Sequence, residues 1–504
     1  MSASRPGRTG VRRVLLLPPL ALAAAVITVA LGPLVAAPTP TPPDASLGPS
    51  PTSNAQLPTT SQRPTTTPDP LTPDTPSSAT PADPSALASE PVGAEPSPSA
   101  TITLPPSATP ATTPGASLAP DPGPEAGAPP AVQPPVSITR PRLPPATRLA
   151  LQARLDRLRE RYAIPGISVA IVLPDGSTWS GVSGLADVPS KAVVTRSTTF
   201  AIASVSKTFT AALILALAED GIIDLDASVR RYLPTLKKVS NKVKVRQLLD
   251  HTSGLRDYFF HASIDRQLLA RPDRRWDPAL ALRYVGKPYF EPGKGFHYSN
   301  TNYLVLGMLA EEVGGAPLAD QVRARFLRPL GLDGTWYQPA DEPPADIAHG
   351  YRFQSASKAA PAIDLSDGTP LVPFTSVVTA AGAAGGFAST ARDIARWAHA
   401  LYGGEVLRPE YLAAMVDATG TTTLKSNIPY GYGTQVLEID GLRTVGHSGR
   451  LLGFRSVVRY LPDQGVSIAV LTNQSRTDPT PIVRSLLRIA LTPLDQPCGC
   501  RQRR

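Results

Sequence analysis

The stretch 201–210, AIASVSKTFT, decides the fold of this chain. It places Ser204 and Lys207 three residues apart, directly before the apolar run 211–218, AALILALA, which is rich in strong helix formers. Residues i and i+3 share one face of a helix, so the Lys207 ammonium can reach back to the Ser204 hydroxyl. The first helical turn also offers free N–H groups, which favour developing negative charge. We therefore predict a nucleophilic serine with a neighbouring amine at the start of a helix.

The same S-x-x-K spacing occurs a second time, at 355–358, SASK. This copy lies in a polar stretch with no helical continuation, and so short a motif arises easily by chance. We interpret the second copy as part of a loop and keep the first as the candidate site.

The composition changes sharply along the chain of 504 residues, which carries 58 prolines and a net charge of +9. Proline, threonine, serine and alanine dominate up to about residue 146, and the first aromatic residue is Tyr162. A packed core needs large side chains, so the sequence predicts a linker over 38–146 and one enzyme-sized domain over 147–493.

Both ends of the chain are basic. Four arginines and no acid precede the apolar segment 14–37, a pattern that directs export. We expect residues 1–37 to be a cleaved signal peptide or a retained membrane anchor. The domain would then lie on the outer face of the cytoplasmic membrane, in the cell wall, or in secreted form. The tail 494–504 holds the only two cysteines, Cys498 and Cys500, whose role stays open.

Hydrophobic periodicity and turn signals predict an α+β (α/β) domain. We expect one antiparallel sheet built from both ends of the domain and flanked by helices, with a mainly helical subdomain inserted between them. The expected elements are a helix over 148–158, a hairpin of 167–172 with 178–182, helices through 211–218, 245–250, 302–309 and 394–401, a hairpin of 456–461 with 466–471, and a last helix over about 481–491.

A lysine that acts as a base needs help, because its pKa must fall by roughly three units from about 10.4. Tyr298 and Asn300, in the segment YSN, supply a phenol that can relay a proton and an amide that can hold both lysine and substrate. The alternatives are a plain core aromatic for Tyr298 and a helix N-cap for Asn300.

A third segment, 445–450, reads VGHSGR and precedes the last hairpin. Such a strand can lie against a substrate and offer N–H groups, which together with that of Ser204 would form an oxyanion hole. His447, Ser448, Gly449 and Arg450 are therefore candidate substrate-binding residues. His447 could instead be a structural histidine, and Arg450 could hold a carboxylate or simply point to solvent.

Other patterns indicate scaffolding or argue against other functions. The segments 251–255, HTSGL, and 381–386, AGAAGG, are interpreted as a loop and a turn, although the second could also be a wall of the cleft. The histidines show no H-E-x-x-H spacing, so we expect no catalytic metal and no cofactor. The positive charge is not interleaved with aromatic residues, which argues against nucleic-acid binding.

In this order and spacing, S-x-x-K, Y-x-N and H-x-G resemble the serine β-lactamase and D-alanyl-D-alanine carboxypeptidase superfamily, in its class C-like branch. The resemblance covers roughly residues 147–491. It implies a β-lactamase/transpeptidase-like fold, with Ser204 as acylated nucleophile, Lys207 as its base and Tyr298 as proton shuttle. It further implies that Asn300 positions the substrate, that 447–449 flanks it, and that no separate deacylating glutamate is needed.

The resemblance also sets the expected activity. The third motif of lactamases is K-T-G, which this sequence lacks, so efficient β-lactam hydrolysis is not expected. The leading hypothesis is a serine hydrolase that acts as a carboxypeptidase on cell-wall stem peptides ending in D-alanine. Alternatives are an esterase or weak β-lactamase of the same fold, a non-catalytic penicillin- or wall-binding protein, and a stalk protein in which the linker matters. The oligomeric state is left open.

Overall fold

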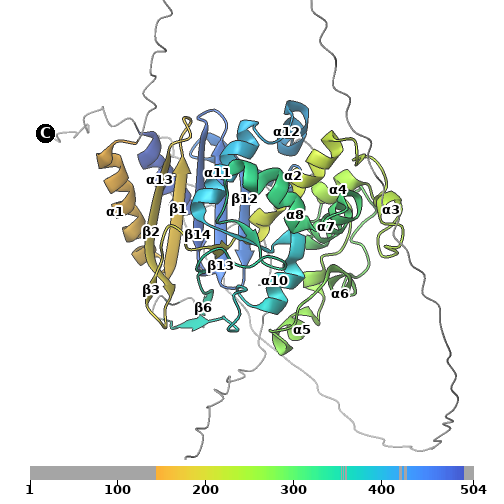
Figure 1. Cartoon of the computed structure of the whole chain (residues 1–504), viewed down its shortest axis with the longest axis horizontal. Helices are drawn as coiled ribbons and strands as arrows, with labels where there is room; N and C mark the ends of the chain where they lie inside the picture. Colours follow the sequence, from red (N-terminus) through yellow and green to blue (C-terminus); the bar gives the residue numbers. More distant parts are fainter. Residues whose placement is uncertain are drawn as a thin grey trace, which may run out of the picture. The chain divides into compact units, whose positions relative to one another are not determined.

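The main sheet has seven antiparallel strands and joins both ends of the described part of the chain (Figure 1). The computed structural model describes residues 143–492 except 354, 356, 358, 359, 419–422 and 425–427. In spatial order the strands are β11 (Gln435–Ile439), β12 (Leu442–Leu451), β13 (Phe454–Leu461), β14 (Val466–Thr472), β1 (Gly166–Val172), β2 (Thr178–Asp187) and β3 (Ala192–Val193).

Pairing of β1 with β14 closes the sheet from the two ends of the domain, with Val169 opposite Val470. The strands β1, β13 and β14 are buried along their whole length, because helices cover both faces of the sheet. The expected hairpins β1–β2 and β13–β14 are both present. The predicted antiparallel sheet from both termini is therefore confirmed.

Two helices from opposite ends of the domain cover one face of the sheet (Figure 1). They are α1 (Pro145–Arg161) and α13 (Thr480–Leu491). Leu151 of α1 and Ile482 of α13 share a core with Val457 of β13, and all three are fully or almost fully buried. Burial of each such side chain stabilises the fold by about 1.5–3 kcal/mol.

The opposite face of the sheet carries α11 (Ala391–Gly403) and, beyond it, the helical middle of the chain. The Thr390 hydroxyl caps α11 by accepting a hydrogen bond from the Asp393 N–H at 3.1 Å. The remaining α-helices are α2 (Ser206–Glu219), α3 (Val229–Tyr232), α4 (Val245–Leu249), α5 (Ile264–Ala270), α6 (Pro278–Leu282), α7 (Asn300–Gly314), α8 (Leu318–Val322), α9 (Arg328–Leu330), α10 (Thr375–Ala381) and α12 (Pro409–Val416).

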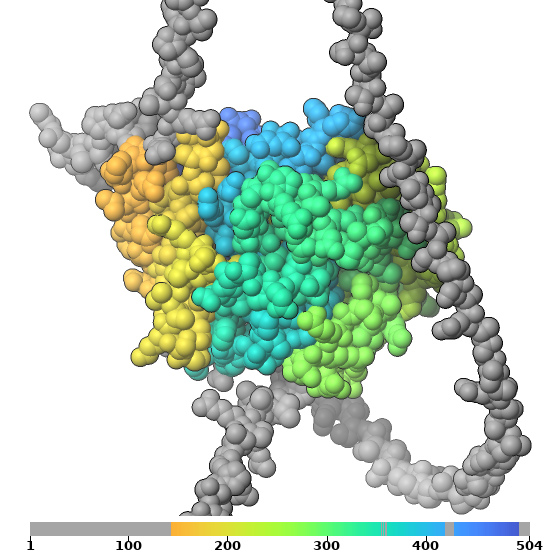
Figure 2. Space-filling model, viewed as in Figure 1, coloured from red at the N-terminus to blue at the C-terminus, as the bar shows by residue number. Residues whose placement is uncertain are grey.

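Short strands and turns connect these helices. The turns are η1 (Ala203–Val205), η2 (Tyr258–Phe260), the π-turn η3 (Arg323–Leu327) and η4 (Gly382–Ala384). The small sheets are β4 (Phe200–Ala201) with β8 (Phe387–Ser389) and β5 (Trp336–Tyr337), β6 (Tyr351–Phe353) with β7 (Ala362–Asp364), and β9 (Thr423–Leu424) with β10 (Ile428–Pro429). The space-filling view shows the middle of the sequence, in green, packed against the rest of the domain (Figure 2).

The predicted terminal segments lie outside the described residues. These are the segment 1–37, most of the linker 38–146, and the tail 494–504 with Cys498 and Cys500. Helix α1 begins at Pro145, close to the predicted start of the domain at residue 147. Within the described part of the chain, no helix combines the length and the apolar character needed to cross a bilayer.

Candidate active site

Ser204 lies in the turn η1, immediately before α2 rather than in its first turn. The preceding residue, Ala203, has a backbone φ of +50°, a left-handed conformation that residues other than glycine rarely adopt. The turn is held from the sheet, because the Ser456 hydroxyl on β13 donates a hydrogen bond of 2.6 Å to the Ile202 carbonyl. The strained backbone is therefore fixed by a neighbouring strand, as is common where a side chain must be aimed.

The Lys207 ammonium is fully buried and points at three acceptors. Nζ donates to Ser204 Oγ at 3.2 Å, to Asn300 Oδ1 at 2.8 Å and to the Ala384 carbonyl at 2.6 Å. Burial lowers the pKa of Lys207 from 10.5 to about 7, and the charge of Asp257 works in the opposite direction. A large fraction of Lys207 is therefore neutral near pH 7, the form that can take a proton from Ser204.

Tyr298 lies beside both groups, just before α7. Its ring centroid is 5.0 Å from Lys207 Nζ. Burial raises the pKa of Tyr298, while interaction with the Ser204 side chain lowers it. The phenol oxygen makes no hydrogen bond of normal length and angle to any described residue. Its proton is therefore available for donation.

Asn300 is the first residue of α7, and both ends of its amide are engaged. The oxygen accepts from Lys207, and Nδ2 donates to Asp257 Oδ2 at 2.7 Å. Asp257 is a buried carboxylate that sequence reasoning did not identify. Its spacing from Ser204 gave no signal, because the two residues are brought together only by the packing of the loop before η2 on α7.

The third segment forms part of β12, next to η1. His447 is buried and neutral, because burial and the charge of Lys207 lower its pKa well below the usual value. Its Nε2 accepts from the Tyr430 hydroxyl at 2.9 Å, and its Nδ1 donates to the Ser448 carbonyl at 2.6 Å. The side chain thus stands at the site as an uncharged ring rather than as a cation. Its predicted role in substrate binding stays a prediction.

Gly449 faces the turn that carries Ser204. A methyl group there would come within 2.4 Å of the Ile202 carbonyl and 2.3 Å of Ser456 Oγ. The strand and the turn can approach this closely only because residue 449 has no side chain.

The side chains of Ser448 and Arg450 lie on the opposite face of the sheet from Gly449, because side chains alternate along a strand. Ser448 Oγ donates to Gln435 Oε1 at 3.2 Å. Arg450 pairs in register with Arg455, whose Nε donates to the Ser475 carbonyl at 3.1 Å. The Arg450 guanidinium therefore points away from Ser204, and only the backbone of Arg450 lies near it.

The two segments interpreted as scaffolding both support the cluster. In the HTSGL loop, His251 Nδ1 accepts from the Ser299 N–H at 3.2 Å and from Asn302 Nδ2 at 3.0 Å. The AGAAGG segment forms the turn η4, whose Ala384 carbonyl binds Lys207. Ser355 of the second S-x-x-K copy is exposed, and Ala356 and Lys358 lie outside the described residues.

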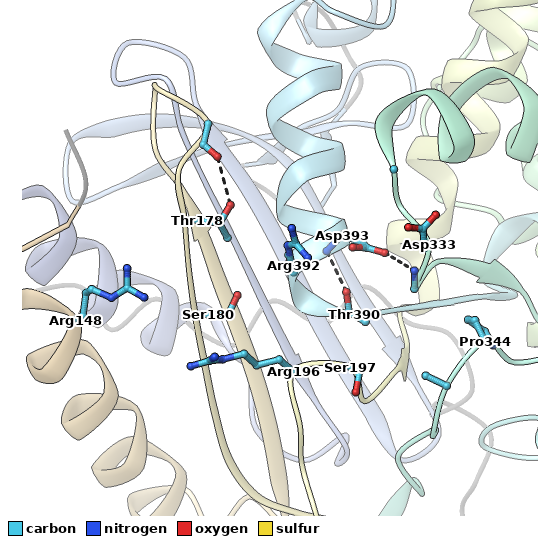
Figure 3. Close-up of a pocket in the computed structure, with 14 residues that line it drawn as sticks. Arg148, Thr178, Ser180, Arg196, Ser197, Asp333, Pro344, Thr390, Arg392 and Asp393 are labelled. Atoms are coloured by element: carbon cyan, nitrogen blue, oxygen red, sulfur yellow. Dashed lines mark hydrogen bonds between the residues drawn. The ribbon is translucent and has the colours of Figure 1, made fainter. Parts of the chain in front are cut away.

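A separate groove of about 730 Å³ lies over β2 and the start of α11 (Figure 3). Arg148, Arg196 and Arg392 line it together with Asp333 and Asp393. Among the described residues that form its walls, none belongs to the Ser204 cluster. The groove is therefore distinct from the candidate active site.

One group of side chains within the described residues has the composition of a metal site. Atoms of Asp187, His349 and Asp364 lie within 4.8 Å of one another. His349 Nδ1 is 2.8 Å from Asp364 Oδ2 and 3.6 Å from Asp187 Oδ1, and the bond to Asp364 is the main cause that raises the pKa of His349. The hydrogen bond from His349 to Asp364 therefore accounts for the contact between these side chains without an ion.

The fold and the cluster of Ser204, Lys207, Tyr298 and Asn300 define a serine hydrolase. The sequence model of the family named Beta-lactamase matches residues 151–491, and the chain belongs to that family. The superfamily and the fold class predicted from the motifs are thereby confirmed.

Several relatives are known by name. The chain is 29% identical over 336 residues to penicillin-binding protein 4* of Bacillus subtilis (strain 168), covering 65% of this chain and 72% of the relative. It is 29% identical over 330 residues to D-aminopeptidase of Brucella anthropi, covering 64% of this chain and 59% of that protein. The chain thus matches less than two thirds of the D-aminopeptidase.

Solved structures of similar proteins agree with this assignment. The D-amino acid amidase from Ochrobactrum anthropi SV3, complexed with D-phenylalanine, is similar with a TM-score of 0.58 and 29% identity, covering 68% of this chain and 99% of that one. A D-stereospecific amidohydrolase from Streptomyces sp. has a TM-score of 0.54 and 28% identity, covering 66% and 94% of the two chains.

Proposed function

We propose that this protein cleaves peptides ending in D-alanine through an acyl-enzyme on Ser204, and that it does so outside the cytoplasm. The observation that carries the chemistry is the buried Lys207 ammonium, 3.2 Å from Ser204 Oγ and with a pKa of about 7. A base with a pKa near the working pH gives the best balance of availability and strength. The basic start of the chain and its apolar segment 14–37 support the location.

The cluster supports a defined sequence of bond changes. Ser204 Oγ attacks the carbonyl carbon of the substrate, and its proton passes to Lys207 Nζ. The Tyr298 hydroxyl gives its proton to the leaving amine and recovers one from Lys207, so the C–N bond breaks and the amine departs neutral. Water then attacks the ester carbon by the same route in reverse, which releases the acid and restores Ser204.

The negative oxygen of the tetrahedral intermediate needs donors that are already in place. The Ser204 N–H, in the turn η1 just before α2, is one. The Ser448 N–H donates to Gln435 Oε1 at 3.1 Å. This N–H group therefore points to the edge of β12 that faces β11. Since alternate residues of a strand direct their N–H groups to the same edge, we assign the second donor to the Arg450 N–H. Asn300, held between Lys207 and Asp257, and the uncharged ring of His447 complete the substrate side.

Hydrolysis of amides of D-amino acids is a second candidate function. It is supported by the similarity to a D-aminopeptidase and to a D-amino acid amidase, both at 29% identity. The two activities differ in which end of the substrate is free: the carboxylate in a carboxypeptidase, the amine in an aminopeptidase.

A panel of substrates separates these activities. The purified full-length chain is incubated with an N-acylated peptide ending in D-Ala-D-Ala, the same peptide ending in L-Ala-L-Ala, D-alanine amide, a small activated ester and a chromogenic cephalosporin. We expect release of D-alanine from the first peptide, little turnover of the cephalosporin, and no reaction of the L-peptide. Turnover of D-alanine amide alone would favour the second candidate. Turnover of the ester alone would contradict both peptide assignments.

A further inference from the structure

Asp257 is a buried acid that is linked to Ser204 by hydrogen bonds through Asn300 and Lys207. None of the proposed reaction steps uses it. The residue is 1% exposed and lies in the loop before η2. Its Oδ1 accepts from the Phe259 N–H at 3.0 Å, and its Oδ2 accepts from Asn300 N at 3.1 Å and Nδ2 at 2.7 Å. None of the ion pairs among the described residues includes this carboxylate, so its buried charge is offset by N–H groups and by the more distant charge of Lys207.

The bonds of Asp257 fix the direction of the Asn300 amide. A carboxylate can only accept, so it requires the Nδ2 end of the amide. An ammonium can only donate, so Lys207 requires the Oδ1 end. With the carboxylate on one side and the lysine on the other, one of the two amide orientations is excluded. A neutral side chain at 257 would fix the amide less strictly.

We propose that Asp257 is a positioning residue for acylation: it holds the Asn300 amide oxygen on Lys207, and its negative charge favours the protonated lysine between turnovers. The proposal rests on the function proposed above, since it concerns the same Ser204 chemistry. Asp257 acts through Asn300 and Lys207 and does not touch the reacting atoms.

The surroundings of Lys207 single out Asp257 as the group that supports its charge. The rings of Tyr298 and Tyr303 lie 5.0 and 5.3 Å from Nζ. His251 and His447 face it as well, and burial together with the charge of Lys207 lowers the pKa of each well below the usual value, so both are neutral. From η4 the contact is the uncharged Ala384 carbonyl.

Two titrations are therefore coupled near neutral pH. Burial raises the pKa of Asp257 to about 6, against the pull of its hydrogen bonds and of Lys207. The pKa of Lys207 is about 7 and would be lower without the acid. Acylation needs neutral Lys207, so its rate rises with pH through the lysine pKa. Removal of the negative charge at 257 must move this rise to lower pH.

The test is the pH dependence of Ser204 acylation in the full-length protein, followed by the rate of adduct formation with a labelled penicillin or an activated ester. Asp257→Asn keeps one acceptor and removes the charge. The acylation rate rises with pH at the acidic side of its pH profile (the acidic limb). We expect this limb to lie about 1 pH unit lower in Asp257→Asn than in wild type. Asp257→Ala also frees the amide, and we expect its plateau rate to fall by about 10- to 100-fold, because a displaced catalytic group can cost about that much.

Asp393→Asn is the matched control. Asp393 is also a buried acid whose pKa is raised by burial, and its Oδ2 accepts from the Gly334 N–H at 2.7 Å. It lines the groove of Figure 3, whose walls include no member of the Ser204 cluster. This variant tests the general effect of losing a buried carboxylate, and we expect it to lower the melting temperature without moving the acidic limb. Circular dichroism and thermal unfolding of each variant report folding.

The outcomes separate the two claims. If wild type is acylated and folded Asp257→Asn keeps the wild-type limb, Asp257 has no role in positioning and the inference is wrong. If Asp257→Ala does not fold, Asp257→Asn alone decides. If the limb moves equally in Asp393→Asn, the effect is a global one and the inference also fails. Absence of any Ser204 adduct in folded wild type would instead overturn the proposed function, and the inference with it.

Discussion

Gly449→Ala tests whether β12 holds the nucleophile in place. An added Cβ would lie 2.4 Å from the Ile202 carbonyl, 2.3 Å from Ser456 Oγ and 3.0 Å from the Ala203 Cβ. Carbon and oxygen atoms normally stay above about 3 Å, so the turn must retreat by roughly 1 Å. The Ser456 hydroxyl cannot rotate away freely, because it donates to Ile202. Its bond is worth about 1 kcal/mol, and the overpacking costs about 1–3 kcal/mol.

The added methyl group would displace Ile202 and Ala203, which directly precede Ser204. The acylation rate should therefore be affected more strongly than the stability of the fold. A shift of about 1 Å in a reacting group can slow a reaction by about 100-fold. We expect Gly449→Ala to lower the acylation rate by about that factor, measured by stopped-flow with an activated ester, and to lower the free energy of unfolding by about 1–3 kcal/mol in urea.

Gly403→Ala is the matched control. An added Cβ there meets only the Tyr460 hydroxyl, at an ordinary 3.7 Å, near the end of α11. We expect it to leave both quantities unchanged or to raise stability slightly, by up to about 1 kcal/mol. Wild-type acylation in Gly449→Ala with an intact fold would refute the reasoning that the strand fixes the turn.

Further predictions concern the other members of the cluster. Tyr298→Phe should slow acylation by about 100- to 10,000-fold in the ester assay, because the proton shuttle is lost. It should leave the melting temperature unchanged or raised, because the buried phenol oxygen interacts with the Ser204 side chain but makes no hydrogen bond of normal geometry to a described residue. A lower melting temperature with unchanged rates would contradict both points. Lys207→Met should abolish acylation and flatten the pH dependence of stability. The pKa of Lys207 is about 7 when folded and 10.5 ordinarily, so the unfolded chain binds more protons in that window and stability rises with pH from about 7 to 10.5. Urea unfolding across that range measures the slope, and an equal slope in the variant would contradict the assigned pKa.

Sequence reasoning reached the fold because the hydrophobic pattern and the chemistry agreed. The strands β1 and β14 are mostly apolar, with Ser168 and Ser467 as their serines, and clear turns lie beside them. Their pairing across the domain was predicted from the order of strands and helices. The i to i+3 spacing that brings Lys207 to Ser204 is a local property of the chain. The backbone there forms the turn η1 before α2, but the reach is preserved.

The parts that sequence reasoning missed depend on tertiary packing. Asp257 follows the HTSGL loop, and nothing in its local pattern distinguishes it from a surface turn residue. Its burial arises because that loop packs on the start of α7. Similarly, no sequence signal tells that His447 receives a hydrogen bond from Tyr430 and is uncharged, since Tyr430 lies in the connection between β10 and β11 and reaches His447 only through the fold. The face to which Arg450 points follows from the register of β12 with β13, which a single sequence does not give.

The central claim is that Ser204 becomes acylated. Intact-mass spectrometry of the full-length protein, after exposure to a labelled penicillin and to an activated ester, measures this directly. The matched control is Ser355→Ala, which removes the serine of the second S-x-x-K copy. The account predicts one adduct per chain in wild type and in Ser355→Ala, and none in Ser204→Ala. An adduct that persists in folded Ser204→Ala, or no adduct in folded wild type with either reagent, would contradict it.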